Sequence, residues 1–322
     1  MKNFTTFYDV DNISELLQEA FLLKKNPLQF NALGKSKTLG LVFLNASLRT
    51  RLSTQKAAMN LGLHVIVLNV NEESWAWEFE EGAVMNGTKV EHIKDAAAVL
   101  SQYCDIVGIR CFPSLANRED DYNENVLKQF MKYCSVPVIS LESATRHPLQ
   151  SFADLITITE NWIKEYKPKV VLTWAPHIKP LPQAVANSFS EWMCNADVDF
   201  VITHPHGYEL NDEFTNGAKI TYEQNSALQN ADFVYVKNWS SYNVYGKIIS
   251  TDNSDWLLSQ EKMEITNNAK IMHCLPVRRN VELTDELLDG KNSLILQQAN
   301  NRLFAAQTVL KKIIEQNFNQ EF

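Results

Sequence analysis

The chain has 322 residues, 45% of them hydrophobic and 21% charged, which is typical of a folded globular protein of two domains. Its net charge of −8 excludes general binding to nucleic acid or to an anionic membrane, because both require an excess of Lys and Arg. With no apolar run of about 18 residues and no apolar signal core near the N-terminus, we expect a cytoplasmic protein with small-molecule partners.

The first half of the chain predicts one α/β domain. Asn12, followed three residues later by Glu15, is typical of a helix start. Short apolar runs rich in Val and Ile then alternate with amphipathic stretches. These runs are residues 39–45, 64–70, 106–112 and 136–142. Because their apolarity is continuous, we interpret them as parallel strands covered on both faces.

A second series of apolar runs predicts a second domain of the same kind. Its members are residues 169–176, 199–205, 232–239 and 269–276. Leu303, Leu310, Ile313 and Ile314 lie at helical spacing in a terminal helix, about 300–318. The fold class is therefore α/β with two doubly wound parallel sheets. We place the boundary within residues 143–150, which gives domains 1–146 and 147–322.

The segment LVFLNASLRTR, residues 41–51, changes from a buried strand to a helix at a run of hydroxyl and guanidinium groups. The first N–H groups of a helix attract anions, and Ser47, Arg49 and Thr50 add donors suited to phosphate. Gly34-Lys35-Ser36 precedes the strand instead of following it and GxGxxG is absent, so a small phosphorylated metabolite is favoured over a nucleotide. Alternatively, the hydroxyls only cap the helix and the arginines pair with surface carboxylates.

Other polar residues follow predicted strands further along the chain. His147 precedes a predicted helix that carries Gln150 and Asp154, and His273 and Cys274 follow the last apolar run. In open α/β sheets, ligands bind at the carboxyl ends of strands, so these residues could line one cleft. Taken singly, each has an ordinary structural explanation as a loop or core residue.

The five cysteines, which are odd in number and widely scattered, include no CxxC pair. This pattern favours reduced thiols over a zinc site or a disulfide framework.

Together these motifs resemble the transcarbamylase family, whose members use carbamoyl phosphate. The matching segments are SLRTR at 47–51, HPLQSFAD at 147–154, HCLP at 273–276 and NRLFAAQTVL at 301–310, which contains Arg302. The resemblance implies a C-terminal helix that packs back on the first domain, a homotrimer with shared active sites, and no cofactor or metal.

Within that family, WAPHIKPLPQAVANSF at 174–189 resembles the proline-rich loop of members that act on N-acylated ornithine, and the Ser-Met-Gly loop of ornithine enzymes is absent. The resemblance implies that a later segment threads this loop and knots the second domain. Val90 stands where acetylornithine enzymes carry glutamate and succinylornithine enzymes a small apolar residue, which favours the succinyl substrate. A shift of one residue would place Glu91 there instead.

The resemblance also implies roles for individual residues. The carbamoyl phosphate ligands would be Ser47, the Leu48 amide, Arg49, Thr50, Trp75, Arg110, His147, Gln150, Cys274, the Leu275 carbonyl and Arg302. Of these, Thr50, Arg110, His147, Cys274 and Arg302 would take part in catalysis. The acylornithine ligands would be Val90, Phe112, Glu142, His177, Lys179, Lys237 and Arg278. A neighbouring subunit would supply Trp75; alternatively, Trp75 is buried within its own domain.

The expected activity is transfer of a carbamoyl group to the δ-amine of N-succinyl-L-ornithine in arginine biosynthesis. Three alternatives remain open: an N-acetylornithine enzyme, an ornithine enzyme, and a non-catalytic phosphometabolite-binding protein.

Overall fold

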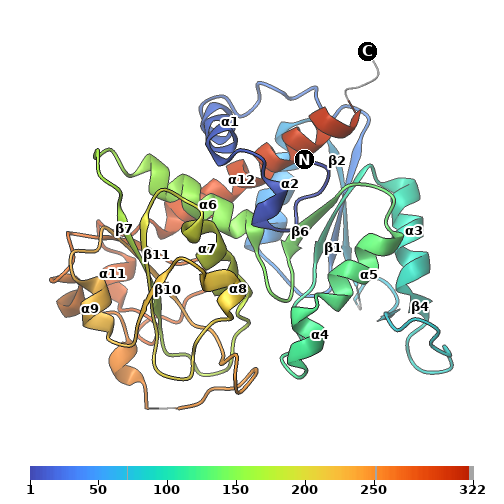
Figure 1. The fold of residues 1–322 in the computed structure, drawn as a ribbon. Helices are drawn as coiled ribbons and strands as arrows, with labels where there is room; N and C mark the ends of the chain where they lie inside the picture. The colour runs from blue at the N-terminus through green and yellow to red at the C-terminus, as the bar shows by residue number, and fades with distance from the viewer. Residues whose placement is uncertain (71, 251, 319–322) are drawn as a thin grey trace. The chain divides into compact units, whose positions relative to one another are not determined.

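The computed structural model describes residues 1–70, 72–250 and 252–318. The chain forms two compact units, each built around one parallel sheet (Figure 1). The first unit comprises Met1–Pro113, Glu119–Leu149 and the residues from Arg302 onward. The second comprises Ser114–Arg118 and Gln150–Asn301.

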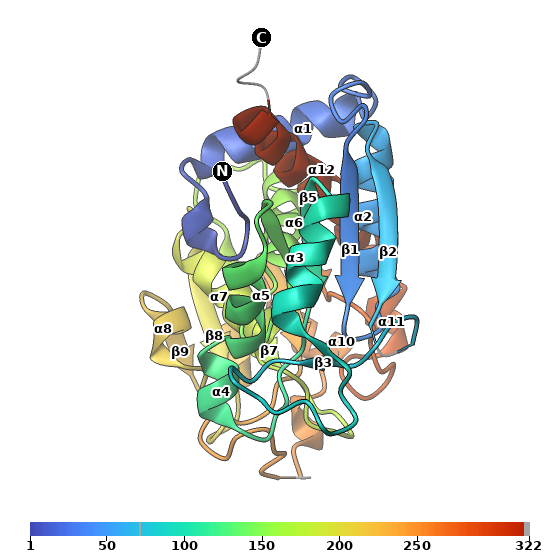
Figure 2. The same cartoon turned by 90° about the vertical axis from the view of Figure 1, so that its right-hand side faces the viewer.

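The first sheet has four strands in the order β2-β1-β5-β6, all parallel. The elements up to its last strand are η1 Phe7–Asp9, α1 Ile13–Lys25, β1 Thr38–Phe43, α2 Arg49–Asn60, β2 His64–Asn69, β3 Trp77–Glu78, β4 Glu91–His92, α3 Ile93–Tyr103, β5 Ile106–Arg110, α4 Arg118–Tyr122, α5 Asn125–Tyr133 and β6 Val138–Glu142. As Figure 2 shows, α3 and α5 cover one face of this sheet, while α2 lies on the other.

The second sheet has five parallel strands in the order β11-β10-β7-β8-β9. The remaining elements are α6 Pro148–Glu160, β7 Lys169–Trp174, α7 Ala184–Cys194, β8 Asp199–Thr203, α8 Asp212–Thr215, β9 Lys219–Thr221, α9 Gln224–Leu228, β10 Phe233–Lys237, η2 Ser254–Trp256, α10 Gln260–Met263, β11 Lys270–Met272, α11 Asp285–Leu288 and α12 Ile295–Phe318. Apolar residues of α9, α10 and α11 pack on one face of this sheet. On α7, Phe189 packs against Tyr235 of β10.

The α/β class with two parallel sheets is confirmed, and each of the eight apolar runs overlaps a strand. The Asn12 cap also forms, since its side chain accepts hydrogen bonds from the amides of Ser14 and Glu15. One expectation is wrong: β2 is not covered on both faces, because it lies at the sheet edge and Ile66 is 50% exposed. The short edge strand β9 was not predicted, because it has only three residues.

The terminal helix α12 begins at Ile295, earlier than predicted, and its residues from Arg302 onward belong to the first unit. Polar contacts attach this part of the helix to that unit. Gln307 accepts a hydrogen bond from Asn60 of α2 at 3.0 Å, and Lys311 pairs with Glu19 of α1 at 3.0 Å. The C-terminal helix therefore packs on the first unit, as the resemblance implied.

The strand orders place a change of direction in the middle of each sheet. In the first sheet it lies between β1 and β5, and in the second between β7 and β10. Loops that follow such neighbouring strands diverge to opposite faces and leave a crevice at the carboxyl ends of the strands. Residues 44–48, Arg110, residues 175–183 and Lys237 occupy these positions.

Candidate functional site

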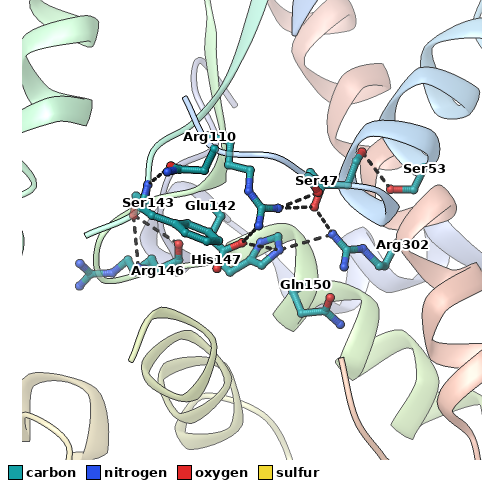
Figure 3. Close-up of polar contacts among 12 residues, drawn as sticks. Ser47, Ser53, Arg110, Glu142, Ser143, Arg146, His147, Gln150 and Arg302 are labelled. Carbon is teal, nitrogen blue, oxygen red and sulfur yellow. Dashed lines mark hydrogen bonds and ion pairs between the residues drawn. The ribbon is translucent and has the colours of Figure 1, made fainter. Parts of the chain in front are cut away.

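At the carboxyl end of β1, hydroxyl groups receive hydrogen bonds from an arginine of the neighbouring strand. The Nη1 atom of Arg110, the last residue of β5, donates to Ser47 Oγ at 2.8 Å and to Thr50 Oγ1 at 3.1 Å (Figure 3). The helix α2 begins at Arg49, and no side chain caps it at Leu48. The alternative that these hydroxyls only cap the helix is therefore wrong.

Two residues from distant parts of the chain join this cluster. Arg302 of α12 donates through Nη2 to the Thr50 hydroxyl, and the same nitrogen lies 3.4 Å from His147 Nε2 (Figure 3). Thr50, Arg110, His147 and Arg302 are all at most 9% exposed. The first unit thus brings two guanidinium groups, an imidazole and the Thr50 hydroxyl together in one buried place, and the partly buried Ser47 hydroxyl contacts this cluster through Arg110.

Glu142, at the end of β6, holds the opposite side of Arg110. Its Oε2 atom lies 3.1 Å from Arg110 Nη2 and 3.6 Å from His147 Nε2. The Arg110 guanidinium also lies over the ring of Phe112, 4.4 Å from its centroid. Glu142 and Phe112, which the resemblance assigns to the acylated amino acid, thus both contact Arg110 in this structure.

The pKa of His147 lies well below its ordinary value, because the ring is buried and because Arg302, Arg110 and Arg49 disfavour a further positive charge. The imidazole is therefore neutral at physiological pH. Its Nδ1 atom is buried without a hydrogen-bond partner among the described residues. A neutral ring that accepts from Arg302 at Nε2 carries its proton on Nδ1 and can donate it to a ligand.

A second carboxylate, Glu124, fixes the loop that leads to His147. It accepts hydrogen bonds from Ser143 Oγ at 2.6 Å, from the Thr145 amide at 2.8 Å and from the Ala144 amide at 3.2 Å. Glu124 could not be recognised from the sequence, because it follows a run of acidic residues and nothing in the local pattern marks it as buried.

The segment between β2 and β4 carries Val90, which was expected to face the acyl substrate, and Trp75, which was expected to enter the site of a neighbouring subunit. Trp75 is 63% exposed and Val90 is 62% exposed. Trp77, in contrast, is buried and stacks on Phe130 with ring centroids 6.3 Å apart. The alternative that Trp75 is buried in its own domain is therefore wrong.

In the second unit, the loop after β7 contacts the loop after β11. Arg278 Nε donates to His177 Nε2 at 3.1 Å, and His177 Nδ1 lies 2.8 Å from the Lys179 carbonyl oxygen. Burial lowers the pKa of His177, which keeps the ring neutral and able to accept from Arg278. Lys179 is exposed, while Lys237 is buried at the end of β10. Cationic groups thus follow β7, β10 and β11.

The residues after β11 are held by a buried glutamate, Glu282, which was not predicted from the sequence. His273 Nδ1 accepts from the Leu275 amide at 2.9 Å, so its proton lies on Nε2, which faces Glu282 Oε2 at 3.0 Å. Although burial alone would raise the pKa of Glu282, the hydrogen bond from His273, the charge of Lys237 and the hydrogen bond from the Arg278 amide keep that pKa below its ordinary value. Glu282 also accepts from the Arg278 amide at 2.8 Å.

Sequence profiles of two domains match this chain. The carbamoyl phosphate binding domain of aspartate and ornithine carbamoyltransferases matches residues 2–160, and their aspartate/ornithine binding domain matches residues 182–313. The chain belongs to the aspartate/ornithine carbamoyltransferase family. As a family member it is a carbamoyltransferase.

Among similar carbamoyltransferases, the N-succinylornithine carbamoyltransferase of Bacteroides fragilis is 51% identical over 317 residues, which cover 98% of this chain and 99% of that protein. The N-acetylornithine carbamoyltransferase of Xanthomonas campestris is 35% identical over 95% of each chain. A solved N-acetyl-L-ornithine transcarbamylase, in which one glutamate is replaced by alanine, is bound to carbamyl phosphate and N-succinyl-L-norvaline. Its TM-score with this chain is 0.92 and the two sequences are 34% identical. The match covers 97% of this chain and 100% of that one.

Within residues 1–70, 72–250 and 252–318, no group of three or more His, Cys, Asp or Glu side chains is arranged to hold a metal ion. Over the same residues, no helix is both long and apolar enough to cross a membrane. The five cysteines, which all lie in this part of the chain, are free thiols.

The neutral state of His147 predicts a pH dependence of stability. Below about pH 6.5 the unfolded chain binds a proton at this residue, whereas the folded chain does not until the pH falls to its lower pKa. Stability is therefore lost as the pH falls through this window. We expect His147→Gln to lose less stability than the wild type between pH 7.5 and 5.5 in urea unfolding.

The exposed His64 of β2 provides a matched control, since His64→Gln should keep the wild-type difference between the two pH values. An equal loss of stability in His147→Gln and in the wild type would show that His147 is protonated in the folded protein.

Proposed function

We propose that the protein transfers the carbamoyl group of carbamoyl phosphate to the δ-amine of N-succinyl-L-ornithine, releasing N-succinyl-L-citrulline and phosphate. The observation that carries this proposal is the buried cluster in which Arg110 and Arg302 both donate to Thr50 beside a neutral His147. The Bacteroides relative at 51% identity supports the choice of amine. The reaction would serve arginine biosynthesis in the cytoplasm.

The phosphate would bind at the start of α2. There the Ser47 and Thr50 hydroxyls, the Leu48 amide and the Arg49 guanidinium offer donors beside the partial positive charge of the helix N-terminus. Both hydroxyls accept from Arg110 and so can turn their own protons toward phosphate oxygens. The 1–146 region would thus be the carbamoyl phosphate domain, and Trp75 of a neighbouring subunit would cover the bound phosphate.

Arg110, Arg302, His147 and the Thr50 hydroxyl would surround the carbonyl oxygen. When the amine attacks the carbonyl carbon, negative charge develops on that oxygen, and donors fixed before the reaction stabilise it without rearrangement. Gln150, Cys274 and the Leu275 carbonyl would contact the carbamoyl amino group. The bond between the carbonyl carbon and the phosphate oxygen then breaks, and phosphate leaves with the electron pair and accepts the proton released by the amine nitrogen.

The acylornithine would bind in the 147–322 region together with Val90, Phe112 and Glu142. A free δ-amine has a pKa of about 10 and must lose its proton before it attacks. The cations Lys179, Lys237 and Arg278 would pair with the substrate carboxylates, and their charge would also favour the neutral amine. His177, which accepts from Arg278, would keep that guanidinium in place.

Contacts between the loop after β7 and the segment after β10 support the proposed knot. The Ser240 amide donates to the Leu181 carbonyl at 2.9 Å, and Gln183 Nε2 donates to the Ser240 carbonyl at 2.8 Å. Threading of one segment through the other would keep the cation-bearing loop close to Lys237.

We also propose a homotrimer formed through the first unit. Leu48, the residue before α2, and Leu52 and Met59 on α2 form an apolar stripe that is 57–66% exposed, and Ile66 of the edge strand β2 is 50% exposed. A helix that exposes such a stripe gains stability when a partner covers it. Trp75, also exposed, would enter the active site of the neighbouring chain.

Light scattering tests this assembly. The wild type should have three times the mass of one chain, and Leu52→Glu should dissociate and lose activity. Val99→Glu is a matched control, because Val99 is 51% exposed on the other side of the same sheet and should leave both properties unchanged. A monomeric and active wild type would contradict the proposal.

Replacing one carbonyl ligand tests the chemistry. Because Arg302 is proposed to stabilise charge that develops only in the transition state, Arg302→Ala should lower kcat about 100- to 1,000-fold. Steady-state assays of citrulline formation measure this. Arg279→Ala serves as the control, since Arg279 is an exposed arginine that pairs with Asp285 and Asp289. Near-normal turnover of a folded Arg302→Ala protein would remove Arg302 from the chemistry.

Comparing amines tests the acyl specificity. We expect the wild type to have its highest kcat/KM with N-succinylornithine, above N-acetylornithine and ornithine. Val90→Glu should lower the succinyl value at least about 10-fold by repulsion between carboxylates, with a smaller effect on the acetyl value. Val84→Glu, also in an exposed part of the segment, is the control. A wild-type preference for the acetyl compound would favour the alternative enzyme, and failure to form product with any amine would favour a binding protein.

A further inference from the structure

A buried glutamate holds the turn that connects β6 to α6 in the first unit. Glu124 lies directly before α5 and is 8% exposed. Its Oε1 atom accepts hydrogen bonds from Ser143 Oγ at 2.6 Å, from the Thr145 amide at 2.8 Å and from the Thr145 hydroxyl. Its Oε2 atom accepts from the Ala144 amide at 3.2 Å. One side chain thus holds three consecutive residues of the turn.

The turn is short and connects two residues of the site. The strand β6 ends at Glu142, and α6 begins at Pro148 with His147 directly before it. The Ser143 amide donates to the Arg146 carbonyl at 2.8 Å, and Ser143 Oγ accepts from the Arg146 amide at 3.2 Å (Figure 3). Because these bonds close the turn, a shift of its first residues also displaces His147.

A carboxylate fits this set of donors, whereas an amide does not. Ser143 and Thr145 are fully buried, so their donors need an acceptor in place of bulk water. Backbone amides never accept, and each oxygen of Glu124 faces one of them. Glutamine at this position has a single oxygen, and its NH2 group would face a backbone N–H. The turn could then satisfy its donors only by moving.

The chemistry of His147 depends on where its ring lies. Its Nε2 atom lies 3.4 Å from Arg302 Nη2 and 3.6 Å from Glu142 Oε2, and its Nδ1 atom is buried without a hydrogen-bond partner among the described residues. A donor stabilises developing charge only at hydrogen-bond distance from the atom that carries it. A misplacement of about 1 Å can therefore cost about 100-fold in rate.

We propose that Glu124 is a positioning residue, which places the Nδ1–H group of His147 against the carbonyl oxygen of the substrate. The inference rests on the proposed function, in which His147 is one of the donors around that oxygen. Since Glu124 acts through His147, its loss should lower kcat and leave binding of the phosphate group at the start of α2 intact. Its loss should also have little effect in a protein that lacks the His147 ring.

A double-mutant cycle measures this dependence. In the wild-type background, Glu124→Gln should lower kcat about 10- to 100-fold, while the Kd for carbamoyl phosphate from calorimetry changes by less than about 3-fold. In the His147→Ala background, which is itself slower, the same change should lower kcat by less than about 2-fold further. A residue that only supports the fold would give the same further loss in both backgrounds.

The substitution changes the acceptor and not the backbone preference. Glu124 has a backbone φ of 53°, and glutamine meets the same conformational cost because its side chain has the same length and branching. Asp120→Asn is the matched control, since it also turns a carboxylate into an amide, at an exposed position of α4 that accepts from Asn125. It should leave kcat unchanged in both backgrounds.

A variant of the turn itself tests the same contact if Glu124→Gln does not fold. Thr145→Val keeps the shape of the side chain and the backbone amide but removes the hydroxyl that donates to Glu124. It should lower kcat about 3- to 10-fold with His147 present and have little effect without it. Circular dichroism checks that each variant is folded.

The outcomes are distinguishable. A folded Glu124→Gln protein with wild-type kcat would overturn this inference, as would equal further losses with and without His147, and the same two results in Thr145→Val would do so if the glutamine variant does not fold. A loss of carbamoyl phosphate affinity as large as the loss of kcat would also overturn it, because this indicates general damage to the site. A wild type that forms no product with any amine would instead contradict the proposed function, and this inference with it.

Discussion

The buried guanidinium of Arg110 is the contact on which the geometry of the first unit depends. It links the ends of three structural elements, since it donates to Thr50 at the start of α2, extends from the end of β5 and pairs with Glu142 at the end of β6. A planar group with five N–H donors suits this task, whereas lysine would offer a single charge without fixed directions. The change of direction between β1 and β5 creates the space, and Arg110 determines which groups line it.

Electrostatics explain why a histidine and not a further cation lies beside the arginines. Glu142 balances part of the charge of Arg110, while the burial of the ring and the positive charges nearby lower the pKa of His147 and keep it neutral. A neutral imidazole donates a hydrogen bond without adding a charge whose desolvation would be costly. The cluster can therefore receive an anion at the start of α2 and still stabilise negative charge on a carbonyl oxygen.

Much of the fold and part of the site could be predicted from the sequence. Continuous apolar runs located the main strands, and the motif segments identified the family, because both signals lie in contiguous residues. The buried contacts of the carboxylates Glu124, Glu142 and Glu282 could not be predicted, since an acidic residue in a sequence gives no sign of whether it is exposed or fixes a loop. Their function follows only from partners distant along the chain, such as Ser143 for Glu124 and His273 for Glu282.

These carboxylates act in the same physical way, by holding polar groups in place. A site that binds anions contains several cations and polar groups, and each of them must be held in place while no ligand is bound. A buried carboxylate holds such groups by accepting hydrogen bonds from them. Glu282 accepts from His273 and from the Arg278 amide, and Asp154 accepts from two glutamines. Because a carboxylate never donates, it also fixes the direction of every partner it binds. In this chain the direction of these polar groups is therefore determined by buried acidic residues.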